Sequence, residues 1–311
     1  MSRESATAFA PASVGNVGIG FDILGFAVDA LGDRVRATRS KTPGVRITGC
    51  SGVVAEIPLE AEKNTAGRSV IALAVAAKPQ FGIELHIEKG IPLGSGLGGS
   101  AASAVAAVVA ANALLDQPFE KIDLLKFAMH GEAVASGSMH VDNIAPSLVG
   151  GLVLTVGIDN PRVKRIPVPK GISAVIVHPH MFLATKQARA ILKRDVAMAD
   201  FVWQTANLAG FISGCYTDDL ELIREGLNDV VIEPQRRQLI PGFTAVRNAS
   251  LAAGSLGCSI SGAGPTMFAW AQTDVAEAVR SAMVQEFARH GVETDHWIVR
   301  VESDGARVVS A

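Results

Sequence analysis

The sequence predicts an α+β protein with two domains, and three observations support this. The chain has 311 residues, which is more than one simple hydrophobic core usually organises. Hydrophobic residues make up 49% and charged residues 19%, a composition typical of a folded globular protein. Strand and helix patterns are mixed along the chain, without the strict βαβ alternation that predicts a parallel sheet.

Charge and cysteine content exclude several function classes. The formal net charge is −2 and basic residues do not cluster, which argues against a nucleic acid or an anionic membrane as partner. Cys50, Cys215 and Cys258 are far apart and form no Cys-x-x-Cys pair, as expected in a reducing compartment. The start of the chain lacks the pattern of a secretion signal. The apolar run at 101–115 is shorter than the roughly 20 residues that span a bilayer. We therefore expect a soluble, cytoplasmic protein.

Hydrophobic spacing predicts the elements of the N-terminal half. Ile83, Leu85 and Ile87 alternate with Glu84 and His86, which indicates a half-buried strand. A glycine-rich loop is expected at 11–22, because three of its residues are glycine. The other expected elements are strands at 7–10, 45–48 and 152–156 and helices at 64–77, 101–115 and 119–135.

Prolines mark the expected domain boundary. Pro161, Pro167 and Pro169 fall within ten residues, and proline interrupts both helices and strands. We therefore expect domains at 1–165 and 166–311. Beyond the boundary the patterns predict strands at 173–178, 266–271 and 294–301, a turn at 259–264, and helices at 186–192, 201–215, 218–227, 243–253 and 275–290.

The run Gly94-Ser-Gly-Leu-Gly-Gly99 matches G-x-G-x-x-G, a pattern with several known uses. A dinucleotide fold needs the motif directly after a strand, and an acid at the end of a second strand. Here a Gly90-Ile-Pro92 turn intervenes, and Asp116 follows a helix instead. No lysine follows Gly99 as in a Walker loop, and the V-A-I-K, H-R-D and D-F-G sequences of protein kinases are absent.

Two interpretations of this run remain: a plain turn with a helix cap, or a phosphate-binding loop. Glycines let successive amides converge on an anion, and a helix N-terminus adds about half a positive charge. Ser100 is placed to offer its hydroxyl to a phosphate-bound metal. Two more glycine- or serine-rich turns, at 13–22 and 259–265, favour the phosphate-binding loop.

Three segments resemble the signature motifs of the GHMP kinases in the order and spacing of that family. They are Pro11-Ala-Ser-Val-Gly-Asn16, Pro92-Leu-Gly-Ser-Gly-Leu-Gly-Gly-Ser-Ala-Ala-Ser103 and Ser261-Gly-Ala-Gly-Pro-Thr266. The resemblance implies a ribosomal protein S5 domain 2-like N-terminal domain and a ferredoxin-like C-terminal domain, with ATP and substrate between them. One departure is Gly99, where the family usually has a serine; a phosphate bound by backbone amides does not need that hydroxyl.

Three further segments resemble the branch of this family that phosphorylates homoserine. Residues 137–146 match G-S-x-H-x-D-N-x-A-P and residues 233–242 match E-P-x-R-x-x-L-x-P-G. Residues 184–192 resemble S-T-x-x-A-R-x-I-L, with Ala184 in the place of its serine. The resemblance implies a transferase that uses ATP and Mg²⁺, acts on L-homoserine in threonine biosynthesis, and forms a homodimer. The residue types agree, since arginine forks suit the carboxylate of this zwitterion and an acid suits its ammonium.

The resemblance also assigns roles to residues. The substrate-binding residues are Asn16, Asp22, Thr185, Arg189, Arg236 and Gly262. The ATP-binding residues are Asn64, Pro92, Leu93, Gly94, Ser95, Gly96, Leu97, Gly98, Gly99, Ser100, Ala101 and Ala102. Ser100 and Glu132 would hold Mg²⁺, and His140, Asp142 and Asn143 would form the catalytic group.

Several alternatives stay open at this point. Either Asp142 or Asn143 could lie nearest the reacting hydroxyl, and a loose phosphoryl-transfer transition state tolerates the lack of a strong base. Asn64 suits an adenine contact and a helix N-cap equally. His178 and His180 favour a strand-end loop over a metal pair. The rival functions are another GHMP kinase, such as mevalonate kinase, and a binding or regulatory protein of this fold that has lost catalysis.

Overall fold

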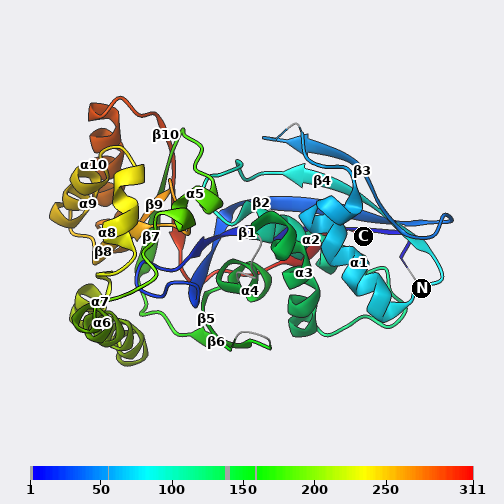
Figure 1. The fold of residues 1–311 in the computed structure, drawn as a ribbon, viewed down its shortest axis with the longest axis horizontal. Coiled ribbons are helices and arrows are strands. Elements are labelled where there is room, and N and C mark those ends of the chain that lie inside the picture. The colour runs from blue at the N-terminus through cyan, green and yellow to red at the C-terminus, as the bar shows by residue number, and fades with distance from the viewer. Residues whose placement is uncertain (1–2, 55, 137–140, 158–159, 311) are drawn as a thin grey trace.

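The computed structural model describes residues 3–54, 56–136, 141–157 and 160–310. In this part of the chain the strands form a 7-stranded and a 4-stranded sheet, side by side along the long axis of the molecule (Figure 1). No helix in the described ranges combines the length and the apolar character needed to cross a membrane. The two-domain mixed α/β prediction is thus confirmed in outline.

The first sheet has the strand order β11-β1-β2-β4-β3, with β5 paired to β2 and β6 paired to β5. All pairs are antiparallel except β3 with β4. Its strands are β1 (Ser5–Gly15), β2 (Leu24–Ser40), β3 (Val45–Gly52), β4 (Gly82–Lys89), β5 (Leu152–Val156), β6 (Arg162–Ile166) and β11 (Arg307–Ser310).

Helices α1 (Thr65–Ala77), α2 (Gly99–Asn112), α3 (Leu124–Ser136) and α4 (Val141–Val149) pack with this sheet. Helix α2 is central, because it contacts β1, β2, β4 and the other three helices. Every α2 residue from Ala101 onwards is buried, which confirms that the apolar run is a core helix. The chain thus places the N-terminus of a fully surrounded helix directly after the glycine loop.

The second sheet has the order β10-β7-β9-β8, formed by Ile172–Pro179 (β7), Gly257–Ile260 (β8), Met267–Gln272 (β9) and Thr294–Arg300 (β10). Helices α9 (Phe243–Ala252) and α10 (Ala276–Arg289) cover one of its faces. The remaining helices of this half are α5 (Thr185–Ala190), α6 (Met198–Thr217), α7 (Leu220–Gly226) and α8 (Glu233–Arg236).

Side-chain alternation along β9 joins the two halves. Met267, Ala269 and Ala271 belong to the core beneath α9 and α10. Phe268 and Trp270 point to the opposite face, where their rings lie 5.7 and 6.0 Å from that of Phe26 on β2. Because aromatic pairs at these distances pack edge to face, β9 contributes to both cores. One pocket draws its lining residues from both halves.

The sequence patterns missed strand β2 and shortened β1. Strand β2 contains Gly25, Gly32 and two aspartates, which resemble turn signals. Gly25 and Gly32 are required because a Cβ there would lie 1.8 Å from the Asp142 carbonyl oxygen and 2.3 Å from that of Ala10. Strand β1 continues through Pro11 because the register shifts there, so a residue without an N–H is tolerated.

Three further strands lie where none was expected. Strand β8 pairs with β9 and includes the first two residues of the turn expected at 259–264; all four of its residues are buried, so no alternation of polar and apolar residues marked it. Strand β6 occupies part of the proline-rich stretch, and β11 returns the end of the chain to β1 in the first sheet (Figure 1). All four residues of β11 are exposed, so the sequence has no alternation of polar and apolar residues from which this strand could be predicted. Strand β6 ends at Ile166 and β7 begins at Ile172, and the domain division at 165/166 stays a prediction.

Candidate active site

Each backbone carbonyl from Gly94 to Gly99 in the glycine loop accepts a hydrogen bond from the protein. The donors, in chain order of the carbonyls, are Leu183 N (3.1 Å), Thr266 Oγ1 (2.6 Å), Ser261 Oγ (2.7 Å), Ser13 N (3.1 Å), Ala102 N (2.9 Å) and Lys89 Nζ (2.8 Å). The negative ends of these peptides are therefore turned towards protein donors. This leaves the amide side of the loop and the N-terminus of α2 to face an anion.

Glycine is sterically required within this loop. Gly94, Gly96 and Gly98 have φ values of 63°, 79° and 65°, which residues with a side chain rarely adopt. A Cβ on Gly98 would also lie 2.2 Å from Ser13 Oγ and 2.9 Å from Asn143 Oδ1. The loop can thus approach Ser13 on β1 and Asn143 on α4 only because these side chains are absent.

The loop forms one wall of a cavity of about 810 Å³, a volume that includes its open mouth. Most of the predicted site residues line this cavity, although they come from both halves of the chain. They are Asn16, Asp22, Pro92, Leu93, Gly94, Ser95, Gly96, Gly98, Gly99, Ser100, Glu132, Asp142, Asn143, Thr185, Arg189, Arg236 and Gly262, and Ala263 joins them. The side chains of Leu97, Ala101 and Ala102 lie instead in the core behind the loop.

A second, more apolar cavity adjoins the first and shares Leu93 and Ser100 with it. Asn64 lines this cavity and caps helix α1: its Oδ1 accepts from Ala66 N at 2.9 Å and from Gly67 N at 3.3 Å. Its Nδ2 donates to the Pro58 carbonyl at 2.8 Å. The N-cap role of Asn64 is therefore present in the structure, and its adenine contact stays a prediction. If the adenine of a nucleotide bound in this second cavity, the phosphates of that nucleotide would lie at the glycine loop.

Ser100 and Glu132 form an oxygen pair beside the loop. Ser100 Oγ donates to Glu132 Oε2 at 2.8 Å, and the Glu132 residue is 6% exposed. Both line the large cavity, one from the start of α2 and the other from α3. Mg²⁺ is commonly held by one or two protein oxygens together with substrate phosphates and water. The pair fits such an ion.

Asn16 organises the end of the cavity that is expected to hold the amino acid. Its backbone N–H donates to Asp142 Oδ2 at 3.2 Å and its Nδ2 donates to the Gly262 carbonyl at 2.8 Å. Its Oδ1 accepts from Asp22 N at 3.0 Å. Asn16 and Asp22 have positive φ values of 69° and 62°, a conformation that asparagine and aspartate tolerate better than most residues. One residue thus ties three of the predicted site residues together.

Arg189 and Arg236 both lie close to the ring of Phe21, a residue that the sequence patterns did not single out. Each guanidinium carbon is 5.2 Å from the centre of the Phe21 ring. Arg189 is ion-paired with Asp22, and Arg236 donates to the carbonyls of Ala188 (3.0 Å) and Gly262 (3.1 Å). Burial, together with the charge of nearby Arg189, lowers the pKa of Arg236 to about 10, so Arg236 stays charged at neutral pH.

Asp142 and Asn143 begin helix α4 beside strand β1. Asp142 is 2% exposed and accepts from the Asn16 amide, while Asn143 Oδ1 accepts from Ser13 Oγ at 2.9 Å. Gly15 allows this approach, because a Cβ there would lie 2.5 Å from Asp142 Oδ2. Both side chains reach the cavity, and His140 lies outside the described residues. Which of the two is nearer to a reacting hydroxyl stays open.

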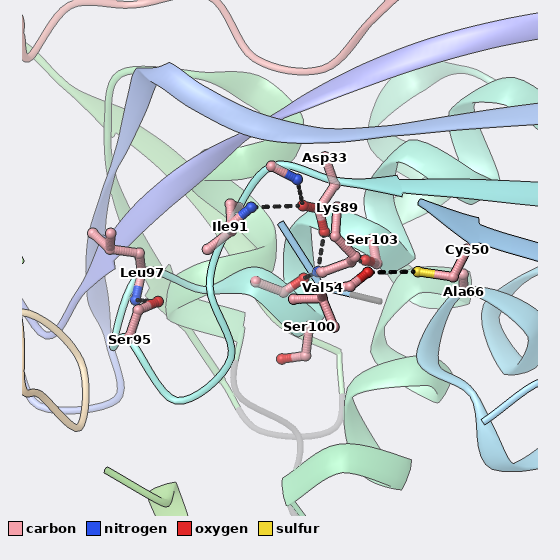
Figure 2. A network of polar contacts seen from close by, with 12 residues as sticks. Asp33, Cys50, Val54, Ala66, Lys89, Ile91, Ser95, Leu97, Ser100 and Ser103 are labelled. Carbon is pink, nitrogen blue, oxygen red and sulfur yellow. Dashed lines mark hydrogen bonds and ion pairs between the residues drawn. The ribbon is translucent and has the colours of Figure 1, made fainter. Parts of the chain in front are cut away.

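The predictions missed a buried polar cluster beneath the loop, formed by Asp33, Lys89 and Ser103 (Figure 2). Lys89 Nζ is ion-paired with Asp33 and donates to Ser103 Oγ at 2.9 Å. A signal for it existed: Lys89 continues the buried positions Ile83, Leu85 and Ile87 at the period of a strand. A lysine on such a face must find a partner inside the protein.

His178 and His180 have separate surroundings. His178 is buried on β7, and its Nδ1 lies 3.0 Å from Thr266 Oγ1. Because the Thr266 hydroxyl donates its one proton to the Ser95 carbonyl, His178 Nδ1 must carry the proton of their bond. Burial lowers the pKa of His178, which is consistent with a neutral ring. His180 instead lies near the surface, 3.1 Å from Asp295.

Two family models match the chain. The model of the GHMP kinases N terminal domain matches residues 64–151, and that of the GHMP kinases C terminal domain matches residues 211–290. A homoserine kinase from Xylella fastidiosa (strain M12) is 48% identical over 309 residues, covering 99% of this chain and 95% of that protein. The homoserine kinase of Chlorobaculum tepidum is 41% identical over 321 residues, covering 99% of each chain.

Solved structures show the same similarity. The crystal structure of a homoserine kinase from Cytophaga hutchinsonii superposes with a TM-score of 0.95 at 44% identity, covering 99% of this chain and 98% of that one. The L. major mevalonate kinase in complex with R-mevalonate gives a TM-score of 0.70 at 15% identity, covering 98% of this chain and 100% of that one. The similarity to mevalonate kinase, at 15% identity, shows a shared fold and no more.

Proposed function

Since this chain belongs to the GHMP kinase family, we propose that its pocket transfers the γ-phosphoryl group of ATP to the side-chain hydroxyl of L-homoserine. The reaction is a phosphotransfer to an alcohol acceptor, and its product is O-phospho-L-homoserine, on the route to threonine. The observation that carries this conclusion is the joint geometry of the cavity. A loop with its carbonyls turned into the protein faces a charged pocket that contains Arg189, Arg236 and Asp22.

The charge pattern of the pocket suits a zwitterion. Asp22 and Arg189 are ion-paired, with side chains 37% and 31% exposed, so both can meet a bound molecule. A substrate with an ammonium and a carboxylate can align its charges against this pair. Arg236, which is also close to Phe21, adds a second planar donor. We assign the carboxylate to the two arginines and the ammonium to Asp22, with Asn16, Thr185 and the Gly262 carbonyl completing the subsite.

The chemistry requires positioning and charge neutralisation more than a strong base. The homoserine oxygen forms a bond to the γ-phosphorus while the bond from that phosphorus to the ADP oxygen breaks, and the hydroxyl proton is released. Asp142, held by the Asn16 amide, and Asn143, held by Ser13, are both placed to orient that hydroxyl. Mg²⁺, held by Ser100 and Glu132, would neutralise phosphate charge.

Mevalonate is the nearest alternative acceptor, because mevalonate kinase shares the fold. It carries a carboxylate and no ammonium. A pocket suited to it would gain nothing from the Asp22 carboxylate and would face repulsion between like charges. The presence of Asp22 beside Arg189 therefore favours the amino acid.

We further propose that the enzyme is a homodimer that associates through helix α6. This helix exposes Met198 (75%), Val202 (56%), Trp203 (63%) and Tyr216 (51%). Asp200 is the one charged residue along the whole described length of α6. An uncharged face is compatible with a second copy of itself across a two-fold axis. Light scattering should give twice the chain mass of 32.3 kDa, and Val202→Glu should halve it; a monomeric parent protein would refute the proposal.

The cytoplasm is the proposed location. Cys50, Cys215 and Cys258 are free thiols, and burial raises the pKa of Cys215 and of Cys258 to about 12. Such groups are stable without a disulfide in a reducing compartment. Fractionation of the producing cells tests this, and recovery with the secreted fraction would contradict it.

Turnover itself is tested by coupled ADP release with Mg-ATP and a panel of acceptors. Homoserine should be turned over, while mevalonate, galactose and shikimate should give only the background rate. A GHMP-fold protein without catalytic function would release no ADP with any acceptor.

A further inference from the structure

The Asp33 carboxylate lies beneath the glycine loop and bonds to both ends of it (Figure 2). Before the loop, its Oδ1 accepts from the backbone amides of Gly90 (2.9 Å) and Ile91 (3.2 Å). After the loop, its Oδ2 accepts from Ser103 in the first turns of α2. The same Oδ2 also accepts from Lys89, the last residue of β4 before the loop. Asp33 is 0% exposed, so water does not compete for these bonds.

Lys89 connects the same carboxylate to the loop itself. An ammonium group has three N–H donors, and the structure gives each of them an acceptor: Asp33 Oδ2, Ser103 Oγ at 2.9 Å and the Gly99 carbonyl at 2.8 Å. With its donors satisfied in this way, the lysine acts on a nucleotide through the loop. Its bond holds the carbonyl of Gly99 towards the interior, at the position where the loop becomes helix.

We propose that Asp33 and Lys89, with Ser103, form a positioning unit that holds the glycine loop in its phosphate-binding conformation. Three of its bonds orient peptide groups at the two ends of the loop, so the amide side faces the cavity before the nucleotide arrives. This unit therefore sets the affinity for the phosphates far more than that for the acceptor. Lys89 and Ser103 also line the second cavity, so a smaller effect on the adenine is expected. The inference rests on the proposed function in one respect, the binding of a nucleotide phosphate at this loop.

The unit can be tested without leaving a buried charge unpaired. The double variant Asp33→Asn/Lys89→Met removes both charges together, so neither partner is left as an isolated ion in the interior. The milder Ser103→Ala removes a single hydroxyl from α2. Its matched control is Ser250→Ala, a buried helical serine in α9 whose hydroxyl bonds to Ser255 at 2.9 Å, in the other half of the protein.

Equilibrium dissociation constants are measured for ATP, ADP and adenosine by displacement of a fluorescent nucleotide. We expect the double variant to weaken binding of ATP and ADP by about 10- to 100-fold and Ser103→Ala by about 3- to 10-fold. Adenosine binding should weaken several-fold less than ATP binding in each variant, although Lys89 and Ser103 also line the second cavity. Ser250→Ala should bind all three as the parent does. Equal weakening of ATP and adenosine, or unchanged ATP binding in both variants, would overturn the proposal.

The result of this nucleotide-binding test is independent of whether homoserine is the acceptor. Binding of ATP to the parent protein without homoserine turnover would refute the proposed reaction and leave the positioning unit testable. If the double variant does not fold, the nucleotide affinities of Ser103→Ala and Ser250→Ala are sufficient to test the proposal. Each of these variants removes one hydroxyl from a buried helix face.

Discussion

Replacement of Arg236 by methionine is expected to weaken homoserine binding far more than ATP binding. The residue is 3% exposed; its Nε donates to the carbonyl of Ala188 and its Nη1 donates to that of Gly262. The rest of the planar group borders the cavity, where it can meet a carboxylate with two parallel hydrogen bonds. Methionine keeps much of the side-chain volume and removes the charge and the donors.

The magnitude follows from burial and bond type. A hydrogen bond to a charged group contributes about 1.5–3 kcal/mol, and screening by water is weak at a buried site. With part of the loss offset by Arg189 and water, a net effect of about 3 kcal/mol corresponds to roughly 150-fold in the homoserine KM. The ATP KM should change by less than about threefold. Gly262 keeps its bond from Asn16, which limits the structural damage.

The assay is coupled ADP release, with thermal denaturation to confirm folding. Arg237→Met is the matched control, because Arg237 is the next residue in the chain and is exposed. Homoserinol, which lacks the carboxylate, provides a second readout. The parent enzyme should prefer homoserine to homoserinol by roughly 150-fold, and Arg236→Met should treat the two nearly alike. Equal rises in both KM values, or undiminished preference in a folded variant, would refute the assigned role.

Three other changes have defined outcomes. Ser100→Ala should raise the Mg²⁺ concentration for half-maximal rate and lower kcat by about 10- to 100-fold, because Glu132 alone would hold the ion. Gly15→Ala should lower kcat more than about tenfold, because its Cβ would lie 2.5 Å from Asp142 Oδ2. Burial lowers the pKa of His178 below 6.5, so below that pH the unfolded chain binds more protons and stability falls. His178→Asn should reduce this acid loss, as measured by urea midpoints between about pH 5 and 7.5.

Each of these expectations can fail in a definite way. An unchanged Mg²⁺ titration in Ser100→Ala would remove that residue from the metal site. Parent-like turnover by Gly15→Ala would show that Asp142 and Asn143 need no close approach to β1. If the stability of His178→Asn falls with decreasing pH as steeply as that of the parent protein, other groups are responsible for the titration.

The site was more predictable than the strands that hold it. Residues proposed to contact the substrates are constrained in type and spacing, so the motifs at Asn16, the glycine loop and Arg236 could be found locally. Strand β2 could not be found in this way. Its glycines are required by the close approach of the backbone of Asp142 and of Ala10, which are distant from them in sequence. Strand β11 is exposed throughout, and only its pairing with β1 defines it.

Residues that support the site without touching substrate were the ones missed. Phe21 contacts two arginines, Arg189 and Arg236, through its ring. All three residues are separated from one another by long stretches of chain. Asp33 and Lys89 are joined only by the pairing of β2 with β4. The burial period of β4 could have indicated that Lys89 is internal, but its partner depends on tertiary structure.

The most direct test of the central claim is the initial rate of ADP release from Mg-ATP, with L-homoserine compared against R-mevalonate, galactose and shikimate. We expect saturable turnover with homoserine, phosphate recovered on the side-chain oxygen of the product, and background rates with the other three acceptors. Absence of turnover with homoserine, or faster turnover with mevalonate, would contradict the assignment of this pocket to a zwitterionic alcohol.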